Sequence, residues 1–202
     1  MLGYSLPEIV SKLKRPACSI CGLIKRYLLN AVAQEIGANY IATGHHLDDL
    51  VPFILKNLMY QNLHEISKLG PKTLSENGLI GKIRPLYEVS EFETEKFTEL
   101  MEIPRVMEKC PYSLEPMINK KIKEFVNKIE KDHRGFKIFF ARSIAKNLDF
   151  YKIDEEEIKY CKYCNSPTNS EICAFCKLTE KLTGKPLGQD VKNKIREIIN
   201  TS

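Results

Sequence analysis

The hydrophobic and polar positions of this chain repeat mainly with the period of an α-helix. In residues 22–36, Ile24, Leu28 and Ala31 fall on one side of a helix. The stretch 115–131 is more strongly amphipathic, because its apolar and basic residues fall on opposite faces. Those faces carry Ile118, Ile122, Phe125 and Ile129 on one side and Lys120, Lys123 and Lys131 on the other. We predict a helix over each stretch.

Three further stretches also fit helices. Residues 7–15 form a short amphipathic run, and residues 135–148 a longer one. Residues 90–101 begin with Ser90-Glu-Phe-Glu93, a capping box in which the two side chains satisfy free backbone N–H groups. The chain is therefore expected to be rich in helices.

Two short apolar stretches fit strands. Residues 39–43 precede Gly44 and a helical stretch that contains Pro52, which a helix accommodates only within its first turn. Residues 82–89 include Pro85, so we expect an edge strand or the end of a strand there. A strand, a glycine and a helix in this order form the βα unit of an α/β fold, and we predict a parallel sheet.

Four cysteines near the C-terminus form the clearest motif. Cys161-Lys-Tyr-Cys164 and Cys173-Ala-Phe-Cys176 are two C-x2-C pairs separated by eight residues. Four thiolates at this spacing can surround one Zn²⁺ tetrahedrally. Because so short a segment has almost no hydrophobic core, metal binding would supply its folding free energy. We predict a structural zinc site.

The other three of the seven cysteines are Cys18, Cys21 and Cys110. Three thiolates could hold three irons of a [4Fe–4S] cluster and leave the fourth iron open. The alternatives are a zinc site completed by His45 or His46, and a catalytic dithiol. Spacing alone does not choose among the three, because Cys110 lies far from the pair.

The turn after the first predicted strand reads Gly44-His45-x-x-Asp48-Asp49. Glycine lets a ligand approach the backbone closely, and a helix N-terminus offers free N–H groups to phosphate. The carboxylates could hold Mg²⁺ or orient a nucleotide. Equally, Asp48 or Asp49 could simply cap the helix, and this is the interpretation that the motif by itself favours.

Positive charge is concentrated in one part of the chain. Residues 117–148 hold nine Lys and Arg against three acidic residues, a net +6 that exceeds the +5 of the whole chain. Such a stretch suggests a polyanion such as RNA, or else a solvated helix face. Lys25 lies one helical turn after Cys21, so it could stabilise thiolates or bind phosphate, although a surface lysine is the simpler interpretation.

Length and composition limit the classes of protein. With 202 residues and 43% hydrophobic residues, the chain can form one ordinary domain and a small appendage. We find no apolar run near 18 residues and no signal peptide, so we expect a cytoplasmic protein without a membrane span. In that compartment, paired cysteines more often bind metal than form disulfides.

Taken together, the motifs resemble one family, the tRNA two-thiouridine synthetases of the TtuA/NcsA group in the PP-loop ATP pyrophosphatase superfamily. The resemblance covers residues 6–181, nearly the whole chain. It rests on Cys18-Ser-Ile-Cys21-Gly22-x-x-Lys25-Arg26, Ala42-Thr-Gly44-His45-x-Leu-Asp48-Asp49, Arg84-Pro-Leu-Tyr87, Cys110-Pro-Tyr-Ser113 and the terminal C-x2-C pairs.

The resemblance implies tRNA 2-thiolation. ATP would adenylate the C2 oxygen of a tRNA uridine, and sulfur held by a [4Fe–4S] cluster would then displace AMP. The implied cofactors are that cluster, Zn²⁺ and ATP with Mg²⁺. The implied partners are tRNA, a ubiquitin-like sulfur carrier and a second copy of the chain as a homodimer.

The resemblance also implies residue roles. The cluster ligands would be Cys18, Cys21 and Cys110. The catalytic residues would be Lys25 and Asp49, and the ATP-binding residues Gly44, His45, Asp48 and Asp49. The zinc ligands would be Cys161, Cys164, Cys173 and Cys176. The tRNA-binding residues would be Lys120, Lys123, Lys131, Arg134 and Arg142.

The chain also departs from the family pattern. Nothing in residues 1–202 matches the Ser-Gly-Gly-x-Asp-Ser loop that cradles the ATP phosphates in the family, or its N-terminal zinc finger. We therefore expect a partial PP-loop domain over 1–150, a zinc finger over 158–180 and a polar tail over 181–202. A fragment, a degenerate protein or one half of a split enzyme would each explain this, and the last would need a PP-loop-bearing partner chain. The competing hypothesis is a non-catalytic, metal-bearing tRNA-binding module.

Overall fold

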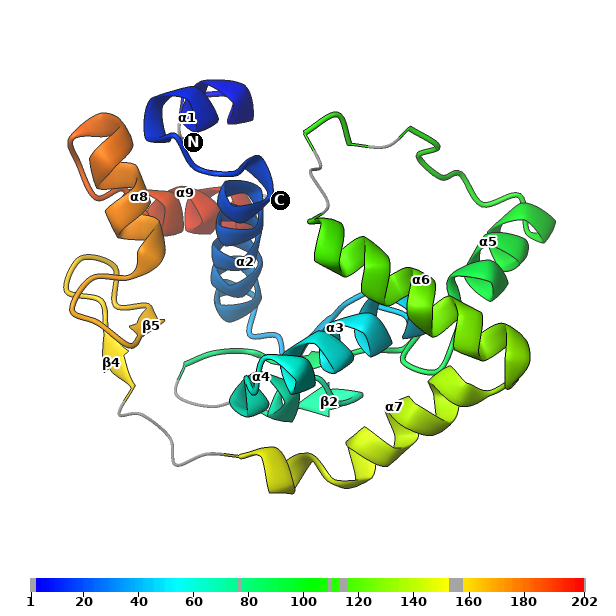
Figure 1. Cartoon of the computed structure of the whole chain (residues 1–202). Coiled ribbons are helices and arrows are strands. Elements are labelled where there is room, and N and C mark those ends of the chain that lie inside the picture. Colours follow the sequence, from blue (N-terminus) through cyan, green and yellow to red (C-terminus); the bar gives the residue numbers. More distant parts are fainter. Residues whose placement is uncertain (1–2, 76–77, 109, 113–115, 153–157, 202) are drawn as a thin grey trace.

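Helices make up most of the protein, with short strands between them (Figure 1). The computed structural model describes residues 3–75, 78–108, 110–112, 116–152 and 158–201. The helices are α1 (Leu6–Leu13), α2 (Ala17–Glu35), α3 (Leu47–Met59), α4 (Leu63–Ser67), α5 (Glu91–Leu100), α6 (Met117–Asp132), α7 (Phe136–Lys146), η1 (Leu148–Tyr151), α8 (Ala174–Thr183) and α9 (Gly188–Asn200). The strands are β1 (Tyr40–Ala42), β2 (Lys72–Thr73), β3 (Gly81–Ile83), β4 (Lys159–Tyr160) and β5 (Pro167–Thr168).

The predicted helices are all present, and two boundaries differ from expectation in an informative way. Helix α2 begins at Ala17 rather than at residue 22, so its first turns contain the Cys18 and Cys21 pair. Strand β3 ends at Ile83, because Arg84 opens a turn that the Tyr87 N–H closes by donating to the Arg84 carbonyl at 3.1 Å. The proline in that turn has no N–H with which to continue the strand.

The sheet confirms the predicted α/β class, although it is mixed rather than wholly parallel. Its order is β1-β3-β2, with β1 parallel and β2 antiparallel to β3. The parallel pair aligns Ala42 with Ile83, and the Thr43 N–H donates to the Ile83 carbonyl at 2.9 Å. The carboxyl ends of both strands therefore meet at one edge, where ligands bind in open α/β sheets.

The main hydrophobic core lies where α3 packs against α6 and α7. Ile54 of α3, Val126 of α6 and Ala141 of α7 are fully buried there. The predicted apolar face of α6 is therefore largely correct, but Phe125 is 56% exposed. This packing fixes the N-terminal turn of α3, which follows the carboxyl end of β1.

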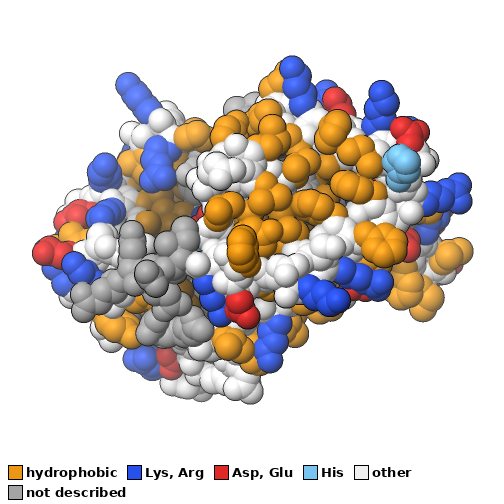
Figure 2. All heavy atoms as spheres, turned by 60° about the horizontal axis from the view of Figure 1, so that its bottom comes forward, with side chains coloured by type: hydrophobic (Ala, Val, Ile, Leu, Met, Phe, Trp, Pro, Cys, Tyr) orange, Lys and Arg blue, Asp and Glu red, His pale blue; other side chains and the backbone are white. Residues whose placement is uncertain are grey.

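Hydrophobic side chains also remain at the surface. Figure 2 shows many of them gathered on the face that includes α7, at the bottom of Figure 1. Phe139 of α7 is 71% exposed and Phe150 of η1 is 84% exposed. Exposed apolar side chains in such numbers are typical of surfaces that contact another molecule. None of the described helices has the length and apolar composition required to cross a bilayer.

The C-terminal part forms a second core against α2. The four cysteines of the module, Phe175 of α8 and Val191 of α9 are buried together with Ala31 of α2. The Tyr27 ring of α2 stacks on Phe175, with ring centroids 3.8 Å apart. Residues 188–200, expected as part of a polar tail, form an amphipathic helix instead, because Val191 and Ile195 fall on its buried side.

Candidate metal centres and nucleotide-binding turn

The paired cysteines lie in the first turns of α2. Cys18 is exposed and Cys21 is half-buried, and three-residue spacing on a helix places them on one side. Lys25 continues the same face one turn further along. The pair is therefore accessible and suited to binding a metal or cluster.

The loop that carries Cys110 reaches the start of α2. The Cys18 Sγ lies 3.9 Å from the carbonyl oxygen of Tyr112, a contact between residues 94 positions apart. Cys110 itself is exposed. The predicted meeting of this loop with the paired cysteines could not be derived from spacing, since it depends on the path of the chain through α5 and α6.

The three sulfurs do not form a single-ion site. Within the described part of the chain, the C-terminal cysteines are the one set of three or more His, Cys, Asp or Glu whose ligand atoms all lie within 4.8 Å of one another. The arrangement thus gives no support to a zinc ion held by Cys18, Cys21 and Cys110 with a histidine. Cluster ligands bind separate irons, so they stand further apart than the ligands of one ion.

Gly44 stands in the turn between β1 and α3 with open space beside it. Apart from its two chain neighbours, no described residue has an atom within 4 Å of the position that a Cβ would occupy there, and the backbone is outside the left-handed region. Neither the packing nor the conformation of the protein therefore requires glycine. Close approach of a ligand would require it, which fits a nucleotide at this turn.

The carboxylate of Asp49 both caps α3 and remains accessible to a ligand. The His46 N–H donates to Asp49 Oδ2 at 3.4 Å, and His46 Nε2 lies 3.4 Å from the same oxygen. Asp49 thus helps to cap α3, as the simpler interpretation of the sequence predicts. Its side chain remains 46% exposed, so its carboxylate is also open to a ligand.

Asp48 is committed to the fold. Its Oδ1 pairs with the buried Nζ of Lys137 on α7, and its Oδ2 accepts the Glu91 N–H at the start of α5 at 2.7 Å. Burial by itself would raise the pKa of Asp48, but these hydrogen bonds outweigh it and lower the pKa. The resemblance implied that Asp48 binds ATP, whereas here both oxygens have internal partners and Asp48 supports the turn from behind.

Positively charged residues act on one another near the turn: Arg84 is buried, Lys82 is half-buried and Arg26 is exposed. Burial and the neighbouring Arg84 lower the pKa of His45, so its imidazole is neutral at pH 7. Burial, Arg84 and Arg26 lower the pKa of Lys82. Neither Lys82 nor Arg26 forms an ion pair with a residue that the structure describes. A bound anion such as phosphate would relieve this repulsion.

Sequence reasoning did not assign Lys82 or Arg26 to a site. A signal was present, because Lys82 and Arg84 are two residues apart at the end of a strand and so point to one side. The Arg26 side chain folds back over the preceding turn of α2, where its guanidinium Nη1 lies 3.0 Å from where a Cβ on Gly22 would stand.

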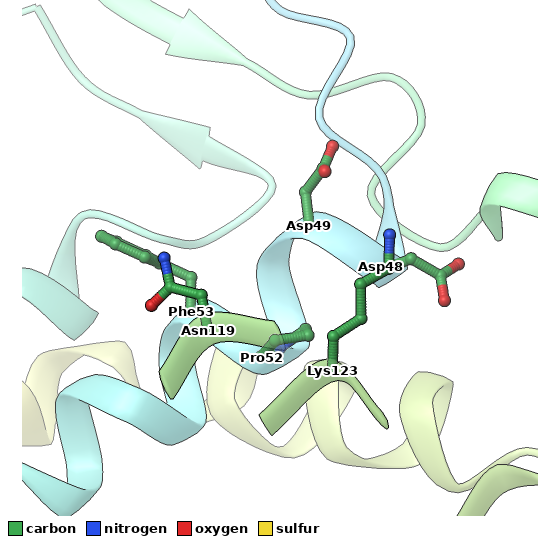
Figure 3. A pocket seen from close by; sticks show the side chains of 6 residues that line it. All are labelled: Asp48, Asp49, Pro52, Phe53, Asn119 and Lys123. Atoms are coloured by element: carbon green, nitrogen blue, oxygen red, sulfur yellow. The ribbon is translucent and has the colours of Figure 1, made fainter. Parts of the chain in front are cut away.

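A cavity opens beside the same turn, between α3 and α6 (Figure 3). Its volume is about 140 Å³, and it is lined by Asp48, Asp49, Pro52, Phe53, Asn119 and Lys123. Figure 3 shows the two aspartates diverging from the first turn of α3 and Lys123 extending toward that turn from α6. Sequence reasoning did not predict this cavity, because its two walls come from distant segments.

The four C-terminal cysteines have the geometry of a metal site. All four are buried, and the Sγ atoms of Cys164 and Cys173 are 3.7 Å apart. Two sulfurs bound tetrahedrally to zinc at about 2.3 Å would be separated by about 3.8 Å. The predicted site is thus assembled, and the Cys176 N–H donates to the Cys173 Sγ at 3.4 Å as part of it.

The protonation of these thiols also indicates a cation. Hydrogen bonds from Cys173 and Ser166 hold the pKa of Cys164 at about 4, in spite of burial. Burial and the Cys164 thiolate raise the pKa of Cys176 to about 12. In the protein alone these two thiols cannot both ionise at neutral pH. A divalent cation would allow several thiolates to share the space.

The basic stretch is partly neutralised within the protein. Arg142 makes two hydrogen bonds to the Glu88 carboxylate, at 2.8 and 2.6 Å, and Lys123 pairs with Glu91 at 2.8 Å. Lys120 lies 4.0 Å from Glu124. Of the five residues predicted to bind tRNA, Lys131 and Arg134 are the two without an ion pair to a described residue.

Comparison with known proteins connects these features. No protein-family model matches the chain. A tRNA-5-methyluridine(54) 2-sulfurtransferase of Pyrococcus horikoshii is 38% identical over 179 residues, 88% of this chain and 57% of that protein. One from Thermus thermophilus is 34% identical over 180 residues, 87% of this chain and 55% of that protein. The tRNA 2-thiolation protein NcsA of Haloferax volcanii is 26% identical over 89% of this chain and 60% of that protein.

A solved structure agrees with these relatives. The U34-tRNA thiolase NcsA from Methanococcus maripaludis, solved with its [4Fe-4S] cluster, aligns with a TM-score of 0.67 and 28% identity. The alignment covers 82% of this chain and 53% of that chain. The chain therefore spans little more than half the length of the proteins that it matches.

Proposed function

The chain is related in sequence and fold to the tRNA 2-sulfurtransferases of the TtuA/NcsA group, and on that premise we propose that it takes part in ATP-dependent 2-thiolation of a tRNA uridine. The observation that carries the proposal is the 3.9 Å contact between Cys18 and the Tyr112 carbonyl. This contact supports a site in which Cys110 joins Cys18 and Cys21 at the start of α2, beside Lys25.

We assign Cys18, Cys21 and Cys110 as ligands of a [4Fe–4S] cluster. When bound, such a cluster would supply one iron without a protein ligand, open to sulfur. The exposure of Cys18 and Cys110 suits a group that must reach a large RNA substrate. Lys25 would lie on the same face, where its charge stabilises the negative charge that develops as sulfur attacks C2 and AMP leaves.

The turn after β1 would hold the nucleotide. The open space beside Gly44 admits the adenylate, and the exposed carboxylate of Asp49 is available for Mg²⁺ or for the reacting uridine. The unpaired Lys82 and Arg26 would neutralise phosphate. Asp48 keeps the turn in place through Lys137, and the neutral His45 lines the approach.

The phosphate-cradling loop would come from outside residues 1–202, either from a PP-loop-bearing partner chain or from another segment of a longer protein. Adenylation requires pyrophosphate to leave, and no segment of this sequence offers the Gly-rich loop that would bind it. The C-terminal cysteines would hold Zn²⁺ and present a rigid module beside tRNA. Lys131 and Arg134, which have no ion pair with a described residue, would contact the phosphate backbone.

Anaerobic reconstitution tests the cluster assignment. Protein reconstituted with iron and sulfide should bind about four irons per chain and show broad visible charge-transfer absorption. Cys110→Ala should lose both, and Ser19→Ala, which lies between the paired cysteines, should keep both. Unchanged iron content in Cys110→Ala would contradict the three-cysteine site.

A second candidate is a non-catalytic, metal-bearing tRNA-binding module. The preassembled four-cysteine site favours it, since those sulfurs lie within 4.8 Å of one another and the three N-terminal sulfurs do not. The two functions differ in whether the tRNA becomes thiolated. The protein is incubated with tRNA, ATP, sulfide and a PP-loop-bearing chain, and thiolated nucleosides are then measured by mass spectrometry. Zinc and tRNA binding without iron or thiolation would favour the module.

A further inference from the structure

The cavity between α3 and α6 has the size of a single aromatic ring. Its volume is about 140 Å³. An engineered protein cavity of about 150 Å³ is known to hold benzene, so a ring of six atoms fits this volume. A purine, which has two fused rings, is larger. The cavity is therefore large enough for a pyrimidine base.

The walls of the cavity offer what a pyrimidine needs. Phe53 of α3 is 43% exposed, so part of its ring is free to stack on a base. Asn119 of α6 also lines the cavity, and its Oδ1 atom is buried and has no hydrogen-bond partner in the described part of the protein. An unpaired buried acceptor is unfavourable by itself, and a ligand N–H would satisfy it.

The charges at the cavity suit a nucleotide rather than a free base. The Lys123 Nζ donates one hydrogen bond to Glu91 at 2.8 Å, and an ammonium group has two further donors. Asp49 stands at the same cavity with an exposed carboxylate. A base in the cavity would therefore lie beside a cation for its phosphate and beside the carboxylate that the proposed reaction uses.

We propose that this cavity receives the uracil ring of the tRNA uridine that is to be thiolated. Phe53 stacks on the ring, Asn119 Oδ1 accepts from N3–H while its Nδ2 donates to O4, and Lys123 contacts the adjoining phosphate. The O2 edge then remains free for adenylation near Asp49. The inference rests on the proposed function, and it adds a base-binding site built from α3 and α6.

Photocrosslinking tests the site directly. A tRNA transcript containing 5-iodouridine in place of uridine is bound to the full chain and irradiated, because iodouracil crosslinks to an aromatic ring on which it stacks. Mass spectrometry of the digest should place the crosslink on Phe53 and on a single uridine. Phe53→Leu should lower the yield about tenfold, since it removes the stacking ring.

The matched control is Phe139→Leu on α7, a phenylalanine that is more exposed than Phe53 and lies outside the cavity. It should leave the yield unchanged. Overall tRNA affinity, measured by gel shift, should stay within about twofold in both variants because phosphate contacts dominate it. Two results would overturn the base site and leave the proposed function intact. The crosslink could map to another residue, or it could persist in Phe53→Leu while tRNA still binds.

Competition with mononucleotides tests the role of Asn119. Uridine monophosphate should reduce the crosslink, and 3-methyluridine monophosphate, which lacks the N3–H donor, should compete at least several-fold more weakly. Asn119→Ala should remove that difference. Competition by AMP but not by uridine monophosphate would show an adenine site and contradict the proposal. Absence of any tRNA binding would remove both this inference and the proposed function.

Discussion

Asp48 and Asp49 are neighbours in the sequence, but the fold places them in opposite surroundings. Both oxygens of Asp48 are bound by Lys137 and by the Glu91 N–H, and its side chain is almost fully buried. Asp49 is nearly half exposed. Because a buried and fully paired carboxylate cannot reach a substrate, Asp48 supports the turn, whereas the carboxylate of Asp49 is open to the role proposed for it.

Asp48→Asn should therefore destabilise the protein. The substitution leaves the Lys137 charge buried without a counter-ion, which costs about 3 kcal/mol or more in the free energy of unfolding. Chemical denaturation measures this loss. Asp48→Asn combined with Lys137→Met should recover part of it, since no unpaired charge then remains. An additive loss in the double variant would contradict a direct pair.

The Asp48–Lys137 pair should make the stability of the protein depend on pH in the acid range. The pKa of Asp48 is lowered in the folded state, so its stabilisation is complete above the unfolded value of about 3.9. It is lost as pH falls further, through the folded pKa. The unfolding free energy of the parent protein should thus decline below about pH 4, and the Asp48→Asn variant should show a shallower decline there.

Gly44→Ala should separate ligand binding from stability. The added methyl group meets no protein atom within 4 Å, so the unfolding free energy should change by about 0.5 kcal/mol or less. A nucleotide that approaches the backbone there should bind at least tenfold more weakly, which calorimetry with the ATP-competent assembly would measure. Unchanged nucleotide affinity would mean that the ligand does not pass over Gly44.

At the scale of elements, α9 connects the cysteine module to the rest of the molecule. Its first residue, Gly188, packs against Cys176 and Cys164, and its carbonyl accepts a hydrogen bond from the Tyr27 hydroxyl of α2 at 2.8 Å. The Lys192 Nζ of α9 donates to the Cys164 carbonyl at 2.8 Å. The helix thus closes the module against α2 and shields its sulfurs.

Gly188→Ala should loosen this closure. A Cβ there would stand 2.5 Å from the Cys176 Sγ and 2.8 Å from the Cys164 Cβ, so α9 or the module must shift. We expect a loss of about 1–3 kcal/mol in the unfolding free energy and faster removal of zinc by a chelator. The neighbouring Gln189→Ala, at an exposed position, is the control and should change neither quantity. Equal zinc release in both variants would contradict the close approach.

At the scale of the whole molecule, one face of α2 is left exposed by the residues that the structure describes. Strand β1 is at the edge of its sheet among the described strands. Leu29 and Val32 of α2 and Ile36 just after it are 53%, 38% and 58% exposed, and their spacing places them on one face of the helix. An open strand edge beside exposed apolar residues is suited to pairing with another chain.

ATP turnover should depend on such a chain. Alone, the protein should not release pyrophosphate, and a PP-loop-bearing chain from a relative should restore release in the presence of tRNA. Leu29→Glu should weaken that complementation about tenfold, because it charges the apolar face. Leu100→Glu on α5, which replaces another exposed leucine, should not. Robust pyrophosphate release by the isolated chain would refute the need for a partner.

Local patterns predicted much of the architecture and part of the site. The helical period of Ile24, Leu28 and Ala31 predicted α2, although not its start at Ala17, which follows the rigid Pro16. Ser90 and Glu93 correctly predicted the start of α5. The length of β3 was overestimated, because apolar residues beyond Ile83 continue into a turn rather than a strand.

The sequence by itself determined six helices, α1–α3 and α5–α7, and the four-cysteine module, since each depends on residues within a turn or a hairpin of one another. It also determined the relationship to tRNA 2-sulfurtransferases, because those motifs keep their order along the chain. Tertiary structure decided that Asp48 pairs with Lys137, 89 positions away, and that Cys18 meets the loop of Tyr112. It also joined Phe53 and Asn119 around one cavity. Such contacts depend on how helices pack around a common core, and no local propensity specifies that packing.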